Sequence, residues 1–223
     1  MRQADKPLLR RAAAHRAKPL LIAGLAGTLL LGGGRAVAGV PEILAFGDSL
    51  TTGFGLPADE AFPKRLEAKL KAEGLNVRVV DAGNSGDTTA DGLARLDWAL
   101  ADKPDFVLLE LGANDMLRGI DPDTVRANLD AMIAKIQASG AKVLLMGMRS
   151  VANWGADYRR RFERIYPELA KAHGVALYPF FLDGVALDPK LNQPDGLHPN
   201  RRGVAVLVNR IAPVVAKLIG GRS

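Results

Sequence analysis

Cysteine is absent from the 223 residues of the chain, and histidine occurs only three times. The lack of cysteine excludes disulfide bonds, thiolate metal sites, a cysteine nucleophile and a lipid-modified N-terminal cysteine. With so few histidines and no cysteine, a protein metal site is not expected. No cofactor is predicted. Hydrophobic residues make up 48% of the chain and charged residues 24%, which indicates a globular domain rather than a disordered, collagen-like or polytopic membrane protein.

Most of the chain also lacks an excess of positive or of negative charge. The formal charge of +6 and the pI of about 9.7 would, taken alone, point to nucleic acid or anionic lipid. However, residues 1–38 hold seven basic side chains and one acidic side chain, which accounts for the whole excess. Residues 39–223 carry 23 basic and 23 acidic side chains. No nucleic-acid partner is therefore predicted.

The basic leader has the pattern of a secretory signal peptide. An apolar run from Leu20 to Leu31 follows its basic residues, and the small-x-small sequence Ala36-Val37-Ala38 predicts cleavage before Gly39. The run is shorter than the ~20 residues that span a bilayer comfortably, so no stable membrane anchor is expected after cleavage. We predict a signal peptide over 1–38, an exported (periplasmic or secreted) protein, and one domain over 39–223. An uncleaved anchor and a twin-arginine route remain open.

Short apolar runs alternate with amphipathic stretches through the rest of the chain. The runs suit strands buried on both faces, and they are Ile43–Phe46, Val77–Val80, Phe106–Leu111, Lys142–Met148 and Val175–Tyr178. Helices are predicted over Ala61–Glu73, Asp91–Leu100, Asp123–Gln137, Tyr158–Ala172 and Asn200–Leu218. This alternation predicts an α/β fold of three layers, with a roughly five-stranded parallel sheet and helices on both faces. The protein is expected to be a monomer.

Polar residues follow three of the predicted strands, where ligands bind in sheets of this kind. Ser49 directly follows the first strand and could be a nucleophile or a helix cap. Residues 81–88 follow the second strand and suit a tight loop whose N–H groups face a ligand, or a plain turn into a helix. Asn114 follows the third strand and could donate to developing negative charge or shape its loop.

His198 is the expected base for such a nucleophile, since only two histidines follow the leader. The other, His173, precedes Gly174 at a predicted helix end, where a surface histidine complements the helix dipole. Asp195 lies three residues before His198 and could orient its ring. Together, these elements predict an acyl-transfer site.

These motifs resemble those of the SGNH hydrolases, also called GDSL esterases. The resemblance covers nearly all of 41–219 and rests on Gly47-Asp48-Ser49-Leu50, Ser85-Gly86-Asp87-Thr88, Gly112-Ala113-Asn114-Asp115, and Asp195 with His198. It implies a flavodoxin-like SGNH hydrolase fold in which Ser49, Asp195 and His198 are catalytic. It also implies an oxyanion hole formed by the N–H groups of Ser49 and Gly86 and by the Asn114 amide.

Further similarity points to the branch of periplasmic acyl-CoA thioesterases, lysophospholipases and arylesterases. It lies in Gly92-Leu-Ala-Arg-Leu96, in Asn114-Asp115 with Leu117-Arg118-Gly119, and in Asp195-Gly-Leu-His-Pro-Asn200. The resemblance implies hydrolysis of aryl, acyl-CoA or lysophospholipid esters, so the expected partner is a small acyl-ester or lipid substrate. A polysaccharide O-deacetylase of the cell envelope and a catalytically silent envelope binding protein are the alternatives.

Apolar residues near the expected site could line an acyl groove, although ordinary packing would explain each equally well. The candidates are Leu117, Ile120, Trp154, Tyr158 and Phe181. Met116, Met146 and Met148 are expected in the core. Asp48, Asp87 and Asp115 are expected to accept hydrogen bonds from loop N–H groups rather than to catalyse.

Overall fold

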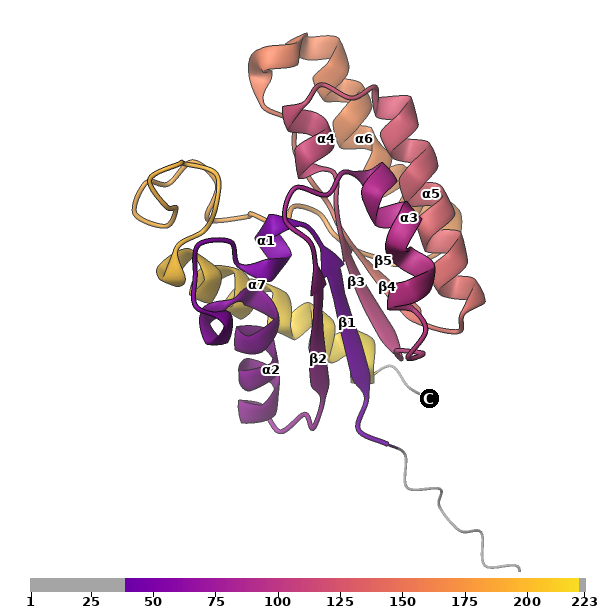
Figure 1. The fold of residues 1–223 in the computed structure, drawn as a ribbon, viewed down its shortest axis with the longest axis vertical. Helices are drawn as coiled ribbons and strands as arrows, with labels where there is room; N and C mark the ends of the chain where they lie inside the picture. The colour runs from indigo at the N-terminus through magenta and orange to yellow at the C-terminus, as the bar shows by residue number, and fades with distance from the viewer. Residues whose placement is uncertain (1–38, 221–223) are drawn as a thin grey trace, which may run out of the picture. The chain divides into compact units, whose positions relative to one another are not determined.

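A computed structural model of the protein describes residues 39–220 (Figure 1). The predicted signal peptide, 1–38, lies outside these residues. Five strands form one parallel sheet in the order β2-β1-β3-β4-β5. They are β1 (Glu42–Gly47), β2 (Arg78–Gly83), β3 (Phe106–Glu110), β4 (Lys142–Met146) and β5 (Ala176–Tyr178). The predicted parallel α/β sheet is confirmed.

Helices cover both faces of this sheet. The five longer helices are α2 (Phe62–Ala72), α3 (Thr89–Ala99), α5 (Pro122–Ala138), α6 (Gly155–His173) and α7 (Arg201–Gly220). Helices α2 and α7 pack together on one face, whereas α5 contacts both α3 and α6 on the other (Figure 1). All five predicted helices are present, with ends shifted by a few residues, and the three-layer arrangement is confirmed.

Helix ends follow the local signals in the sequence. Pro122 is the first residue of α5, directly after the capping Asp121, where its missing N–H and fixed φ cause no penalty. Gly74 and Gly140 follow the last turns of α2 and α5 with φ of +87° and +92°. Only glycine adopts this left-handed conformation without strain, so both helices stop where predicted.

The core is built from the strands and the inward faces of the helices. In β3, all five residues are buried, as expected for a strand covered on both faces. Helix α7 is, within residues 39–220, the one helix long and apolar enough to cross a membrane. Its apolar residues Val204, Leu207, Ile211 and Val215 are almost completely buried, and it packs against α2. These contacts identify α7 as a core helix of the domain.

Two short helices, α1 (Ser49–Thr52) and α4 (Ala113–Leu117), were not predicted. Two 3₁₀ turns, η1 (Ala58–Glu60) and η2 (Ala152–Trp154), complete the elements. Each short helix starts within three residues of a strand end, α1 after β1 and α4 after β3. Both therefore lie at the carboxyl edge of the sheet, where they carry Ser49 and Asn114.

Candidate active site

Ser49 occupies the first turn of α1. Asp48 caps this helix by accepting a hydrogen bond from the Leu50 N–H at 2.9 Å. Because Asp48 is the cap, the alternative interpretation of Ser49 as the capping residue is wrong. Gly47 is required before it, since a Cβ there would lie 2.1 Å from Thr51 Oγ1 and 2.6 Å from the Glu110 carbonyl oxygen. Ser49 is thus held on a tight strand-to-helix turn with its side chain partly exposed.

His198 reaches Ser49 from the loop between β5 and α7. Its Nε2 lies 2.9 Å from Ser49 Oγ, and its Nδ1 lies 2.7 Å from Asp195 Oδ2. Asp195 Oδ1 also accepts the backbone N–H groups of His198 and Leu197. Hydrogen bonds from the His198 N–H and ring, and from the Leu197 N–H, lower the pKa of Asp195 to about 2. The carboxylate therefore stays ionised and orients the imidazole.

Gln193 fixes the loop that carries His198 and Asp195. Its backbone N–H donates to the His198 carbonyl oxygen at 2.8 Å. Its side-chain Nε2 donates to the carbonyl oxygens of Phe54 and Pro199 at 2.6 and 3.1 Å. Phe54 follows α1, and its ring lies 4.7 Å from the His198 ring. One amide side chain thus joins the loop of the base to the segment of the serine.

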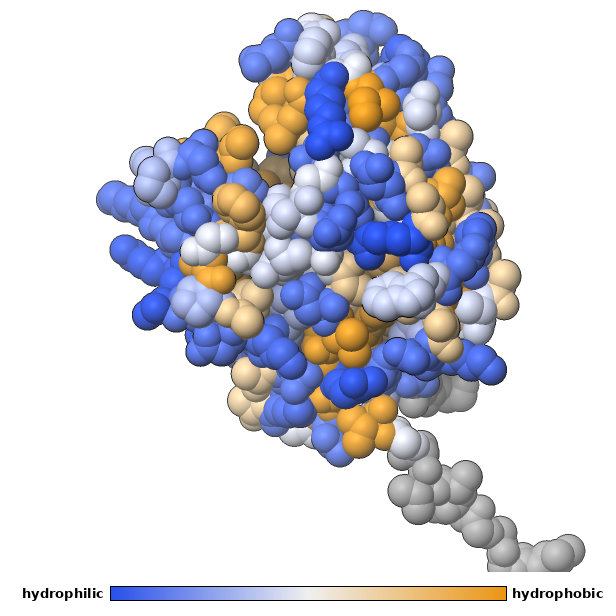
Figure 2. Space-filling model, in the orientation of Figure 1, coloured by the Kyte–Doolittle hydropathy of each residue, from blue (hydrophilic) through white to orange (hydrophobic). Residues whose placement is uncertain are grey.

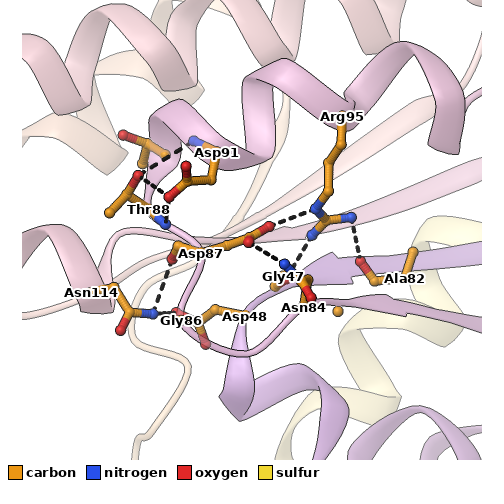
Figure 3. Close-up of polar contacts among 12 residues, drawn as sticks. Gly47, Asp48, Ala82, Asn84, Gly86, Asp87, Thr88, Asp91, Arg95 and Asn114 are labelled. Carbon is orange, nitrogen blue, oxygen red and sulfur yellow. Dashed lines mark hydrogen bonds and ion pairs between the residues drawn. The ribbon is translucent and has the colours of Figure 1, made fainter.

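Gly86 lies in the turn after β2, which a hydrogen bond from the Asp87 N–H to the Asn84 carbonyl oxygen closes at 3.1 Å. Gly86 has φ of +88°, so a side chain at this position would be strained. Asn114 lies in the first turn of α4, and its Nδ2 donates to Asp48 Oδ2 and to the Asp87 carbonyl oxygen, both at 3.0 Å (Figure 3). The two amide hydrogens of Asn114 thus join the serine turn to the glycine turn.

Three acidic side chains are buried beside the serine turn, and burial raises the pKa of each. The pKa of Asp48 rises to about 6. That of Glu110 rises well above its ordinary value, and the Asp48 charge raises it further. Glu110 Oε2 accepts the Thr51 hydroxyl at 2.7 Å. Asp115 accepts the N–H and hydroxyl of Thr89 at 2.8 and 2.6 Å. Burial therefore favours the protonated form of Glu110.

Asp48 and Asp115 accept backbone N–H groups as predicted, whereas the Asp87 carboxylate accepts none from residues 39–220. The Asp87 carboxylate instead accepts from the side chains of Arg95 and Asn84. His173 is the last residue of α6, and its Nε2 lies 2.7 Å from Asp130 Oδ1. Its predicted structural role at a helix end is confirmed.

A cavity of about 370 Å³ opens beside Ser49 and His198. Figure 2 shows the surface hollowed at this edge of the domain, with hydrophobic residues along the rim. The apolar lining residues are Leu50, Phe54, Ala113, Met116, Leu117, Leu182 and Leu197, and Ser85, Gly86 and Asn114 complete the wall. Phe54, Leu182 and Leu197 were not predicted as lining residues, and Met116 had been expected in the core. Each lies within a few residues of a motif or of Phe181, which was their only sequence signal.

Of the five apolar candidates for an acyl groove, only Leu117 lines this cavity. Phe181 is fully buried, and its ring packs at a near-right angle to that of Phe62 with 5.1 Å between the ring centroids, so its assignment to the groove is wrong. Trp154 Nε1 donates to the Met116 carbonyl oxygen at 2.7 Å, and Tyr158 Oη donates to the Ile120 carbonyl oxygen at 2.9 Å. Ile120, Trp154 and Tyr158 therefore stabilise the segment that contains α4 instead of lining the cavity.

Comparisons with known proteins agree with this geometry. Residues 45–206 match the model of the GDSL-like Lipase/Acylhydrolase family. The chain is 41% identical to an arylesterase of Vibrio mimicus over 79% of this chain and 88% of that protein. It is 39% identical to thioesterase 1/protease 1/lysophospholipase L1 of Escherichia coli K12, over 82% and 86%. The crystal structure of AlinE4, an SGNH-hydrolase family esterase, matches with a TM-score of 0.68 and 47% identity over 80% of this chain and 96% of that one. Taken with these matches, the arrangement of serine, glycine, asparagine and histidine shows that the chain belongs to the GDSL-like lipase/acylhydrolase family of hydrolases.

Proposed function

We propose that the protein is an exported serine esterase that hydrolyses carboxylic esters and thioesters through an acyl-enzyme on Ser49. The observation that carries this proposal is the chain of contacts from Asp195 Oδ2 through the His198 ring to Ser49 Oγ, at 2.7 and 2.9 Å. Ser49, at the end of this series of contacts, lines an apolar cavity. A nucleophile, a base and an orienting carboxylate in that order are the requirements of acyl transfer.

In the acylation step, Ser49 Oγ attacks the substrate carbonyl carbon while His198 Nε2 takes the hydroxyl proton. The imidazolium that forms is stabilised by Asp195, which stays ionised because its pKa is about 2. His198 then gives the proton to the departing alkoxide, phenolate or thiolate. In deacylation, His198 takes a proton from a water molecule as its oxygen attacks the acyl carbon. The bond between the acyl carbon and Ser49 Oγ then breaks, His198 returns the proton to Ser49 Oγ, and the acid is released.

The negative charge of the tetrahedral intermediate falls on the former carbonyl oxygen. The N–H groups of Ser49 and Gly86 and the Asn114 amide would stabilise it. Ser49 is the first residue of α1, so its N–H has no partner within that helix. Both Asn114 amide hydrogens already donate, to Asp48 and to the Asp87 carbonyl. A charged oxyanion is a stronger acceptor than a neutral carbonyl, so it would draw one of these hydrogens toward itself.

The cavity lining supports an acyl chain as the group bound next to Ser49. Leucine, methionine and phenylalanine side chains dominate the wall, and each methylene buried there contributes about 0.8 kcal/mol to binding. An acetyl group would leave most of this apolar surface unused. The proposal therefore favours aryl, acyl-CoA or lysophospholipid esters over the acetyl groups of a polysaccharide. Export is supported by the leader pattern of residues 1–38.

Replacement of Ser49 by alanine tests the proposal. We expect kcat for p-nitrophenyl butyrate to fall by about 10⁴ or more, as serine-triad deletions do. Ser139→Ala, at the end of α5 where the hydroxyl donates to the Ile136 carbonyl oxygen, provides the control and should keep wild-type activity. Full activity in purified Ser49→Ala would contradict the serine mechanism.

A chain-length series separates the proposed esterase from the deacetylase. We expect kcat/KM for p-nitrophenyl esters to rise from acetate to octanoate, because longer chains bury more methylenes. Activity on acetate alone would favour the deacetylase, and a correctly folded protein without any activity would favour a binding role. Palmitoyl-CoA and a lysophosphatidylcholine, assayed under the same conditions, compare thioester with oxyester.

A further inference from the structure

Arg95 and Asp87 form an ion pair beneath the candidate site, and the proposed mechanism uses neither side chain. Arg95 Nε donates to Asp87 Oδ2 at 2.5 Å. The Asp87 side chain is only 5% exposed, so its charge needs a partner in place of water. Figure 3 shows Arg95 extending from α3 toward the strand ends and the loop of Gly86.

The remaining nitrogens of Arg95 bind the ends of two strands. Nη1 donates to the Ala82 carbonyl oxygen in β2, and Nη2 donates to the Gly47 carbonyl oxygen at the end of β1, both at 2.9 Å. The guanidinium also lies over the Phe46 ring, 4.0 Å from its centroid. One rigid planar group thus fixes β1, β2 and Asp87 relative to one another. Gly47 is two residues before Ser49, so the nucleophile is part of this arrangement.

Asp87 connects this arrangement to two of the expected oxyanion donors. Its Oδ1 accepts Asn84 Nδ2 at 2.5 Å, and its N–H donates to the Asn84 carbonyl oxygen at 3.1 Å. These two contacts close the turn that contains Gly86. The Asp87 carbonyl oxygen accepts Asn114 Nδ2 at 3.0 Å. A shift of Asp87 would therefore move the Gly86 N–H and release the Asn114 amide.

We propose that Arg95 is a positioning residue of the oxyanion hole, which acts through Asp87 on the Gly86 N–H and on the Asn114 amide. This inference rests on the proposed function. Arg95 contacts neither Ser49 nor His198, so its effect should appear when the oxyanion forms and should leave substrate binding nearly unchanged.

Replacement of Arg95 by methionine keeps the apolar stem and removes the three donors. We expect kcat for p-nitrophenyl butyrate to fall by about 10- to 100-fold, because donors displaced by an ångström lose much of their effect, whereas KM should change little. Arg95→Lys should not restore activity, since one ammonium group cannot reach all three acceptors. Arg126→Met removes an exposed ion pair of the same chemical type, with Glu168 between α5 and α6, and should keep wild-type kcat.

A double-mutant cycle with Asn114→Ala distinguishes positioning from a general structural role. The cycle compares the factor by which Arg95→Met lowers kcat in the wild type and in the Asn114→Ala variant. If Arg95 acts through this donor, that factor should be at least about threefold smaller in Asn114→Ala. In parallel, an alkyl trifluoromethyl ketone, whose adduct with Ser49 carries the oxyanion, should bind Arg95→Met more weakly by the same factor as kcat/KM falls.

An unchanged kcat in Arg95→Met would overturn the inference. So would a double variant whose kcat falls by the product of the two single-variant factors, because the two residues would then act independently. If Arg95→Met does not fold, Asp87→Asn serves instead. That variant keeps the backbone carbonyl and the contact with Asn84 but removes the charge, and the same cycle is expected. The activity of Ser49→Ala is a separate result, so failure of this inference and failure of the proposed function are distinguishable.

Discussion

Glu110→Gln is expected to make the protein more resistant to alkaline pH. Glu110 is 2% exposed at the end of β3, and burial and the neighbouring Asp48 charge raise its pKa well above the ordinary 4.5. At pH values between the ordinary pKa and the raised pKa of Glu110, the folded protein holds one proton more than the unfolded protein. The free energy of unfolding therefore falls as pH rises, by about 1.4 kcal/mol per pH unit, until the raised pKa is reached.

Glutamine binds no proton in either state, so this slope should disappear in the variant. Its carbonyl oxygen can accept the Thr51 hydroxyl and the Asp48 N–H as Glu110 Oε2 does. Its amide would occupy the place of Oε1, which has no hydrogen-bond partner within residues 39–220. An unpaired amide costs about 1–3 kcal/mol at every pH. The change of stability with pH is thus the informative quantity, whereas its absolute value is not.

Urea unfolding from pH 7 to pH 8, followed by tryptophan fluorescence, measures this change. Asp48 has a pKa of about 6, so it is ionised throughout and contributes little slope. Over this interval the free energy of unfolding of the wild type should fall relative to that of Glu110→Gln, because burial raises the pKa of Glu110. Glu73→Gln, at the exposed end of α2, controls for the loss of a carboxylate and should run parallel to the wild type. If Glu110→Gln also runs parallel to the wild type, Glu110 is not protonated in the folded protein.

Three further changes test the site and its supports. Asn114→Ala should lower kcat by about 10² to 10³, as removal of one oxyanion donor does, with KM measured in the same assay. Leu197→Asp should raise KM for octanoate esters more than for acetate esters, because Leu197 lines the cavity beside His198. Gly112→Ala should destabilise the protein by about 2 kcal/mol or more in urea, since Gly112 has φ of +116° and an added Cβ would lie 2.2 Å from Tyr166 Oη.

The sheet and its main helices could be predicted because their signals are local. A run such as Phe106–Leu111 has enough consecutive apolar residues to indicate a buried strand on its own. Helices α1 and α4 are too short for a helical period to be visible. The expected oxyanion residues could still be placed near one another, since their motifs follow parallel strands whose carboxyl ends share one edge.

Contacts made by long side chains could not be predicted in this way. Arg95 and Gln193 bind backbone carbonyl oxygens of segments far away in the sequence, and a carbonyl acceptor leaves no trace in residue type. The prediction of the residues that line the cavity was partly wrong for a related reason. Phe181 and Leu182 are adjacent apolar residues in a turn, and sequence does not tell which of them faces the core.

Two buried acidic side chains at the carboxyl edge of the sheet differ in their expected importance for catalysis. Asp48 and Glu110 are both buried acids, and each needs hydrogen bonds or a proton to offset the loss of water. Asp48 accepts from Leu50 and Asn114, so it orients both the serine turn and an expected oxyanion donor. The Glu110 carboxyl accepts the Thr51 hydroxyl and the Asp48 N–H and lies beside the Asp48 carboxyl. A stabilising substitution at this edge should therefore be tolerated at Glu110, whereas any substitution of Asp48 should lower kcat even where the fold survives.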